Sequence, residues 1–457
     1  MRSIEKQREK FNMSKVHVYR HQYGVGQGCF HAQELIFGEA RQEQETYRFV
    51  YDCGSSTCQD SLKWSIDHFA KGIDNKVVHA AYLSHFENDH INGLESLCHK
   101  LDVHRIYAPH IDPGKVLHII AQQLSGGAAW STQYERFVAN VLTVASGGPL
   151  FGVPVTLVTG GPPPQVDDAP GSNTDIGPGT YIVNLPTGST VSHSTRATVS
   201  ISTGAGKAAF PKVIWEIVPW YYGADDHLTL LIVFFMATLT GYDTLLAPGL
   251  EQNATPQQVK AAIVWMKANR AGIADVYDFA MDEFNAYRSI LGLLPFPPNH
   301  NVASLCIYSG PTQKTAAPRS YQTFPALSHP RCLFCGPYDY CHYREHAGAW
   351  IATGDALLKV PDIWSEFEAH FSTSRLDRCS TVLIPHHGAD AASSDNYNEA
   401  LIRSGQNCVI SAGIRNGYRH PHRNVIQKIL TKPAYLQLVT ESQTMGFVEH
   451  LDFMLDI

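Results

Sequence analysis

The sequence predicts a layered α/β fold, and three observations support this. Apolar runs such as KVVHAAYL (76–83) and STVLIP (380–385) alternate with amphipathic stretches such as SLKWSIDHFA (61–70). Hydrophobic residues make up 44% of the chain and charged residues 17%, so its 457 residues can bury a sizeable core. Histidine and aspartate clusters follow several apolar runs, where α/β sheets usually build their sites.

The first half, residues 15–123, is expected to hold the elements of one sheet with its helices. VHVYRHQYGVGQGCFHAQELIFG reads as two strands around a glycine turn, and GVGQG is expected to be a tight hairpin because no helix opens after it. The elements that follow are a strand at 47–54, a helix at 61–70, a strand at 76–84, a helix at 91–101 and a strand at 103–111.

The second half, residues 213–457, repeats this alternation. The expected strands lie at 212–222, 304–310, 349–358, 380–385, 407–414 and 434–440, and two helices lie at about 255–269 and 272–292. Between the halves, residues 124–212 are rich in Gly, Pro, Ser and Ala, which predicts an insertion with long loops and a few edge strands. Residues 1–14 form a charged N-terminal segment.

The charge balance and the apolar runs limit the partners and the location. Lys and Arg total 35 and Asp and Glu total 42, so the net charge is −7 and any nucleic-acid partner would need a local basic groove. The most apolar run, 228–239, is too short to span a bilayer, and no secretory signal is visible at the start. We therefore expect a cytoplasmic protein with no membrane partner and reduced thiols.

The stretch SHFENDHING (84–93) directly follows a buried strand and concentrates potential metal ligands. Imidazole nitrogens and carboxylate oxygens suit zinc, manganese or iron. Taken alone, the stretch could equally be a polar turn in which Asp89 or Asn92 caps the next helix. The histidines and carboxylates that follow strands make up the candidate ligand set: His85, Glu87, Asp89, His90, Asp355, His386 and His387.

In order and spacing, these motifs resemble the metallo-β-lactamase superfamily over roughly residues 15–110 and 299–430. The quoted motifs are VYDCG (50–54), HFENDH (85–90) with Gly93, Gly354-Asp355 and PHHG (385–388). VGQG, LIPHHG and NGYRHPH most resemble the metallo-hydrolase domain of bacterial DNA-uptake (competence) proteins. The resemblance implies an αββα sandwich with large insertions. It also implies a binuclear site bridged by Asp355, and nuclease or phosphodiesterase activity.

One position departs from the family pattern, and a second position has more than one candidate ligand. Glu87 stands where the family has a second histidine; the site could be binuclear with Glu87 as ligand, mononuclear, or non-catalytic. A further family ligand corresponds to His300, with Asn299 or Asn301 as the alternatives. Asp52 is expected to hold a ligand or the loop by hydrogen bonds.

A second metal site is predicted within an insertion at 310–348. CLFCGPYDYCHYREH supplies Cys332, Cys335, Cys341 and either His342 or His346, which fits a four-ligand structural zinc knuckle. Three unligated thiols are the alternative. With two active-site ions, zinc or manganese, this implies three metal ions in all.

The function we expect is a metal-dependent hydrolase, most specifically a phosphodiesterase or nuclease that uses a metal-activated hydroxide at a binuclear site. Asp89, His420 and Tyr418 are the candidate catalytic residues, with His422 as a further donor near a phosphate oxygen. The partner would then be nucleic acid or another phosphodiester. The insertions could bind a protein partner, and a soluble nuclease would suit a defence effector. The alternatives are a small-molecule ester or lactone hydrolase and a non-catalytic regulatory module.

Overall fold

The fold is described from a computed structural model. The structure describes these residues: 13–37, 45–111, 113–158, 181–184, 190–193, 199–202, 213–222, 255–290, 304–312, 320–324, 348–393, 400–442 and 446–456. The predicted zinc knuckle, His300 and residues 1–12 lie outside the described residues. The division of the chain into two halves with insertions stays a prediction.

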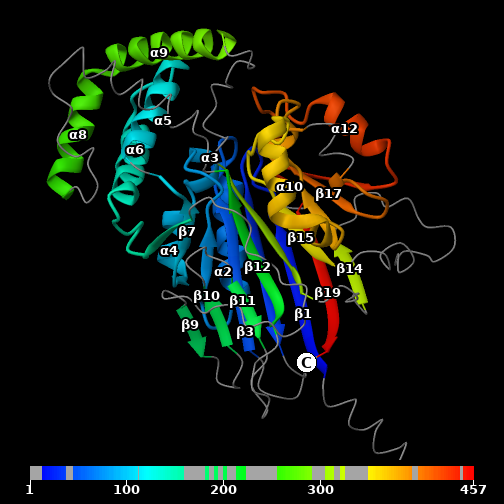
Figure 1. The fold of residues 1–457 in the computed structure, drawn as a ribbon. Helices are drawn as coiled ribbons and strands as arrows, with labels where there is room; N and C mark the ends of the chain where they lie inside the picture. The colour runs from blue at the N-terminus through cyan, green and yellow to red at the C-terminus, as the bar shows by residue number, and fades with distance from the viewer. Residues whose placement is uncertain are drawn as a thin grey trace, which may run out of the picture.

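Two large mixed sheets form the centre of the molecule (Figure 1). The first sheet has the order β14 (Ser320–Phe324), β19 (Phe447–Asp456), β1 (Met13–Gln22), β2 (Phe30–Phe37), β3 (Glu45–Cys53), β5 (Ala80–Tyr82), β7 (Ile106–Pro109) and β8 (Val155–Val158). The second has the order β18 (Tyr435–Val439), β17 (Asn407–Ser411), β16 (Cys379–Leu383), β15 (Ala349–Ala352), β13 (Leu305–Pro311), β12 (Val213–Tyr221), β11 (Val199–Ser202), β10 (Thr190–His193) and β9 (Tyr181–Asn184).

Large aromatic side chains fill the space between the sheets. Trp350 of the second sheet stacks on His31 of the first with ring centroids 4.1 Å apart, and Trp215 meets Phe453 edge to face at 5.4 Å. A buried ion pair lies in the same layer, where Arg20 reaches Glu449 at 2.7 Å. Aromatic rings bury large areas, so this layer is a main source of hydrophobic stabilisation.

Helices cover the outer face of each sheet and complete a four-layered αββα sandwich, as predicted. On the first sheet lie α2 (Gln59–Gly72), α3 (Asn88–Ile91) and α4 (Leu94–Lys100), beside the short strands β4 (Val77–Val78) and β6 (Asp102–Val103). On the second lie α10 (Pro361–Leu376), the 3-10 helix η3 (Pro385–Gly388) and α12 (Arg423–Leu430).

Four further helices form a group at one end of the first sheet (Figure 1). They are α5 (Pro113–Ser125), α6 (Thr132–Ala145), α8 (Pro256–Ala268) and α9 (Arg270–Ile290). Helix α5 packs against α9, and α6 packs against α8. Where the composition of 124–212 predicted long loops, the structure thus has a regular helix in α6, whose N-cap Ser131 accepts a hydrogen bond from the backbone of Tyr134. None of the described helices combines the length and apolar character needed to cross a bilayer.

The parallel strands of the two sheets have their carboxyl ends at the same end of the sandwich. In the first sheet β3, β5 and β7 run parallel, and in the second β15, β16, β17 and β18 do. The strand register aligns these strands: Tyr51 of β3 lies opposite Tyr82 of β5, and Leu383 of β16 lies opposite Val409 of β17. The carboxyl ends of parallel strands are where α/β folds build sites, and the segments after β5, β15, β16 and β17 carry the candidate residues.

The glycine stretch GVGQG lies in the loop of a β-hairpin formed by β1 and β2, as predicted, but this loop is not tight. Residues 23–29 form a longer loop between β1 and β2 that lies against the SHFENDHING segment. Cys29 donates its backbone N–H to the carbonyl of Asp89. A Cβ atom on Gly28, whose φ is +145°, would lie 2.6 Å from the same carbonyl oxygen. The glycine therefore allows two backbones to meet beneath the site.

Candidate metal centre

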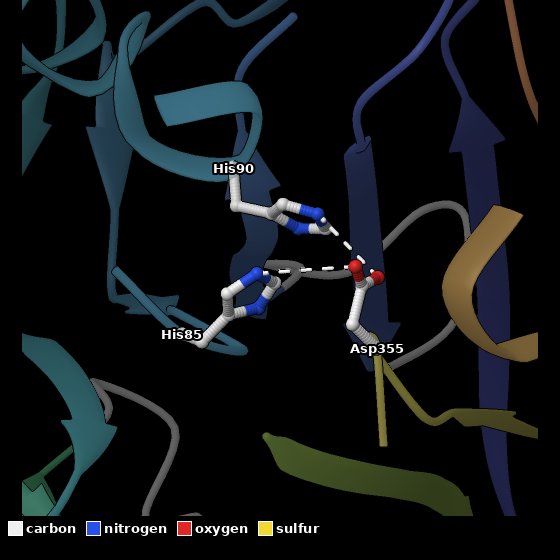
Figure 2. A group of neighbouring side chains, drawn as sticks. All are labelled: His85, His90 and Asp355. Carbon is white, nitrogen blue, oxygen red and sulfur yellow. Dashed lines mark ion pairs between the residues drawn. The ribbon is translucent and has the colours of Figure 1, made fainter. Parts of the chain in front are cut away.

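His85 and His90 both lie in the short segment that follows β5, and His90 belongs to helix α3 within it. Figure 2 shows both imidazoles directed at the carboxylate of Asp355, which arrives from the loop after β15. Helix α3 begins after Glu87, and no side chain caps it; the next helix, α4, begins after Gly93, again without a side-chain cap. The alternative in which Asp89 or Asn92 serves only as a helix cap is therefore wrong. Asn92 instead exchanges hydrogen bonds with the backbone of Ser55.

A strained turn places both His386 and His387 beside Asp355. Their φ angles are +49° and +53°, a left-handed conformation that non-glycine residues rarely adopt, and Gly388 follows at +80°. The backbone N–H of His386 donates to the carbonyl of Gly354, which ties the turn to the Asp355 loop. Such strain persists where the surrounding structure holds it, and it is typical of functional sites.

The candidate ligand atoms lie on two sides of the Asp355 carboxylate. On the Oδ2 side, Nε2 of His386 lies at 3.4 Å and Nε2 of His85 at 4.0 Å. On the Oδ1 side, Nε2 of His90 lies at 3.5 Å and Nε2 of His387 at 3.8 Å. The adjacent residues of the PHHG motif thus serve different sides of one carboxylate.

One further carboxylate joins each side. Glu87 Oε2 lies 3.4 Å from Nε2 of His85. Asp89 lies 3.6 Å from Nε2 of His387 and 4.0 Å from Nε2 of His90. Glu87 therefore lies beside His85, and Asp89 lies near both His90 and His387, with the Asp355 carboxylate close to all four imidazoles.

These distances and the buried nitrogens fit a divalent metal ion. Most of the separations exceed hydrogen-bond length, whereas ligands about 2.0–2.1 Å from a tetrahedral ion lie about 3.4 Å apart. Among the described residues, Nε2 of His90 and Nε2 of His387 are buried without a hydrogen-bond partner. Buried polar atoms normally have partners, so these nitrogens fit metal ligands. Two sets of three could hold an ion: His85, His90 and Asp355, and Asp89, His90 and His387.

The buried histidines and carboxylates of the site shift each other's pKa values. Burial lowers the pKa of His90, but the carboxylates of Asp355, Asp52 and Asp89 outweigh it and raise the pKa to about 10. Burial raises the pKa of Asp355, but His386, His90 and its other imidazole neighbours lower it well below its usual range. The carboxylates thus favour positive charge at this point, whether protons or metal supply it.

Asp52 holds the supporting hydrogen bonds at the end of β3. Its carboxylate accepts the backbone N–H of Ser84 at 2.7 Å, the Ser84 hydroxyl at 2.7 Å and Nδ1 of His90 at 2.8 Å. A carboxylate that accepts from Nδ1 leaves Nε2 with its lone pair toward the site. The carbonyl of Ser411 does the same for His387, accepting from its Nδ1 at 2.8 Å.

Two serines that sequence reasoning missed complete this support. The Ser84 hydroxyl also lies 2.9 Å from Nδ1 of His85, and Ser304 accepts the backbone N–H of Asp355 at 3.2 Å. Ser84 opens the SHFENDHING stretch, so its position was a usable signal. Ser304 meets Asp355 only through the pairing of β13 with β15.

His420 and Tyr418 extend the site outward from His386. The His420 ring centroid lies 5.4 Å from that of His386, and the Tyr418 ring stacks on His420 at 5.7 Å. Burial and then the charge of His386 and other imidazoles lower the pKa of His420 to about 4, so its ring is neutral at pH 7. His422 points instead to the backbone, where its Nδ1 accepts the N–H of Asp390 at 2.9 Å.

His300 and the predicted knuckle residues Cys332, Cys335, Cys341 and His346 lie outside the described residues and stay predictions. The roles of the residues that the structure brings together as ligands also stay predictions.

Comparison with known proteins finds a family model that matches part of the chain. Residues 42–169 match the family model for the metallo-beta-lactamase superfamily. Similar solved structures include a long form RNase Z from yeast, with 16% identity over 28% of this chain and 16% of that chain and a TM-score of 0.16. A metallo-beta-lactamase from Cronobacter sakazakii has 11% identity over 60% of this chain and 94% of that chain, with a TM-score of 0.17. No curated protein matches the chain.

Proposed function

We propose that this chain, which carries a metallo-β-lactamase superfamily domain, is a metal-dependent phosphodiesterase, and more narrowly a nuclease. The superfamily supports a metal-dependent hydrolase in general. The observation that carries the narrower proposal is the pair of ligand groups on opposite sides of Asp355, with His420 and Tyr418 beyond them.

In this proposal the site would hold two divalent ions, zinc or manganese, and Asp355 would serve as a ligand to both. Asp89, His90 and His387 would hold one ion, and His85 with Asp355 would hold the other, to which Glu87 and His386 would add further ligands. When bound, such a pair lowers the pKa of a water and offsets the charge that develops on a phosphate. Glu87 adds a hard oxygen ligand where the family has an imidazole, which favours manganese relative to an all-histidine site.

His420 and Tyr418 would act on the phosphate rather than on the ions. The neutral His420 imidazole offers one N–H, and its Nδ1 is buried without a partner among the described residues. Tyr418 offers a hydroxyl that remains protonated at pH 7, because burial and then the charges of Asp89 and Glu87 raise its pKa. Donors placed beside a reacting phosphate stabilise its developing charge.

Metal content and hydrolysis measured together test the proposal. The wild type is compared with the Asp89→Ala/His90→Ala variant. The control is Asp102→Ala/His104→Ala, which changes an exposed Asp–His pair outside the candidate ligand set. We expect about three metal ions per chain in the wild type and in the control, counting the predicted knuckle, and about one in the site variant. The wild type and control should hydrolyse bis(p-nitrophenyl) phosphate and an oligonucleotide, and the site variant neither.

Two results would contradict the proposal. A wild type that fills both active-site positions but leaves every phosphodiester intact, while opening a lactone or cleaving a carboxylic ester, would assign the site to small-molecule hydrolysis. If all three proteins contain about one metal ion, only the predicted knuckle is occupied. This result would favour the alternative that the protein is a non-catalytic regulatory module.

A further inference from the structure

A basic loop lies at the outer side of the candidate metal centre. We call residues Ile414–Arg423 (IRNGYRHPHR) the arginine loop; it carries three arginines and no acidic residue in a chain whose net charge is −7. Arg415, Arg419 and Arg423 are all exposed. Within the described part of the chain, none of the three guanidinium groups forms an ion pair. Three exposed cations on one short loop make a local site for a polyanion.

The arginine loop is held in place by hydrogen bonds at both ends. The N–H of Ile414 donates to the Glu441 carboxylate at 2.8 Å, and the N–H of His422 donates to the Gly388 carbonyl at 3.0 Å. Inside the loop, Asn416 accepts the N–H of His420 at 2.8 Å and donates to the His420 carbonyl at 2.7 Å. The cations are thus carried on an ordered loop anchored to the PHHG turn.

The loop also presents an exposed aromatic ring next to the ligands. Tyr418 is 70% exposed. Its ring stacks on His420 at 5.7 Å, and His420 lies 5.4 Å from His386. One face of the tyrosine ring therefore rests on the site, while much of the remaining ring surface lies open to solvent. An exposed ring between cations is the arrangement that binds an unpaired base beside a phosphate backbone.

We infer that the arginine loop is a clamp for single-stranded nucleic acid: its three arginines bind backbone phosphates on the outer side of the metal centre, and Tyr418 stacks on an unpaired base. This inference rests on the proposed function and narrows it to a polymeric substrate. A small ester needs neither three phosphate-binding cations nor a stacking ring. The base of a duplex has its faces covered by its neighbours, so stacking on Tyr418 selects single strands.

Binding of a fluorescent 12-nucleotide oligothymidine tests the inference separately from catalysis. The full chain is used with Asp355→Asn as the parent, so that bound strand is not cleaved, and anisotropy is measured over a range of salt. Adding Arg415→Gln/Arg419→Gln/Arg423→Gln should weaken binding at least 10-fold. It should also reduce the slope of log K against log salt by about 2, because each phosphate contact on a single strand contributes about 0.7.

A matched control removes the same charge elsewhere. Arg136, Lys260 and Arg270 are exposed on the helical group, and changing all three to Gln should leave affinity and slope within about twofold of the parent. For the stacking contact, Tyr418→Ala should weaken oligothymidine binding about 5- to 100-fold, and Tyr418→Phe should keep it. Duplex DNA should bind the parent more weakly than the single strand.

The outcomes separate the clamp from the catalytic proposal. If the triple arginine variant binds oligothymidine as tightly as its parent, the clamp is wrong, even when the wild type hydrolyses bis(p-nitrophenyl) phosphate. If binding depends on the arginines but the wild type hydrolyses no phosphodiester, the clamp stands and the proposed function fails. Equal affinity for duplex and single strand, with no effect of Tyr418→Ala, would overturn the stacking contact.

Discussion

Replacing Asp52 with asparagine tests how much the hydrogen bonds beneath the ligands contribute to metal binding. The buried carboxylate accepts three hydrogen bonds, two from Ser84 and one from Nδ1 of His90. Asparagine keeps the volume and tolerates the left-handed backbone at this position, where φ is +56°. The variant therefore changes charge and hydrogen bonding without requiring the backbone to move.

The expected loss of metal affinity follows from the hydrogen bonds that an asparagine amide at this position cannot accept. Its single carbonyl oxygen cannot accept from both the backbone N–H and the hydroxyl of Ser84 and also from His90, and its NH2 group faces at least one of these donors. A hydrogen bond to a charged group contributes about 1.5–3 kcal/mol. Since about 1.4 kcal/mol is tenfold, metal affinity should fall about 10- to 150-fold, in the range typical for the loss of a partner behind a metal-binding histidine.

The assay is a competition titration of zinc and manganese against a chelator of known affinity. Asp67→Asn is the control, because Asp67 is a partly exposed carboxylate that pairs with Lys100 at 2.9 Å. Ser84→Ala, which removes only the hydroxyl, should give a smaller loss than Asp52→Asn. Metal affinity within about twofold of wild type, in an Asp52→Asn protein with unchanged thermal unfolding, would refute the reasoning.

Three further predictions concern pH, the inner core and the glycine loop. In metal-free protein, carboxylates outweigh burial and raise the pKa of His90 to about 10, above its unfolded value near 6.5. The contribution of the charged His90 to the free energy of unfolding should be complete below pH 6.5 and should be lost as pH rises toward 10. Urea unfolding of the wild type and of His90→Gln at pH 6.5 and 9.5 measures this contribution. The same difference in unfolding free energy at both pH values would contradict the prediction. Arg20→Met removes the guanidinium group that neutralises the buried Glu449 carboxylate, so the free energy of unfolding should fall by about 3–5 kcal/mol in urea titrations. A loss under about 1 kcal/mol would show that the pair is not buried as described. Gly28→Ala should lower both thermal stability and metal affinity, because its Cβ would lie 2.3 Å from the Gly54 carbonyl oxygen, whereas Gly72→Ala, with nothing within 4 Å, should leave both unchanged.

The ligand-bearing stretch was visible in the sequence because its signal is local. Apolar residues at 77–83 predict a buried strand, and the polar SHFENDHING segment that follows must emerge at the strand's carboxyl end. The same reasoning applies to Asp355 and to PHHG. Chain order and composition therefore sufficed for the layered α/β class and for most of the candidate ligand set.

The sequence could not decide how the ligands divide. His386 and His387 are adjacent, and only the left-handed turn at both residues places them on opposite sides of Asp355. No composition rule predicts two consecutive residues in that conformation, because neighbouring segments rather than local preference hold them there.

Helix α6 was missed for the opposite reason. The Gly- and Pro-rich composition of 124–212 as a whole hid a short amphipathic stretch, which the packing of α6 against α8 stabilises. Here an average over a long window masked a local pattern.

The alternation of strands and helices, and the kinds of candidate ligand at the strand ends, can therefore be predicted from the chain alone, because both depend on residues close together in the chain. Tertiary structure alone decided that the loop 23–29 supports Asp89 from below, that Ser304 holds Asp355, and that the arginine loop stands beside His386. Each of these is a contact between segments far apart in sequence, and such contacts follow from the pairing and packing of the two sheets rather than from any local periodicity.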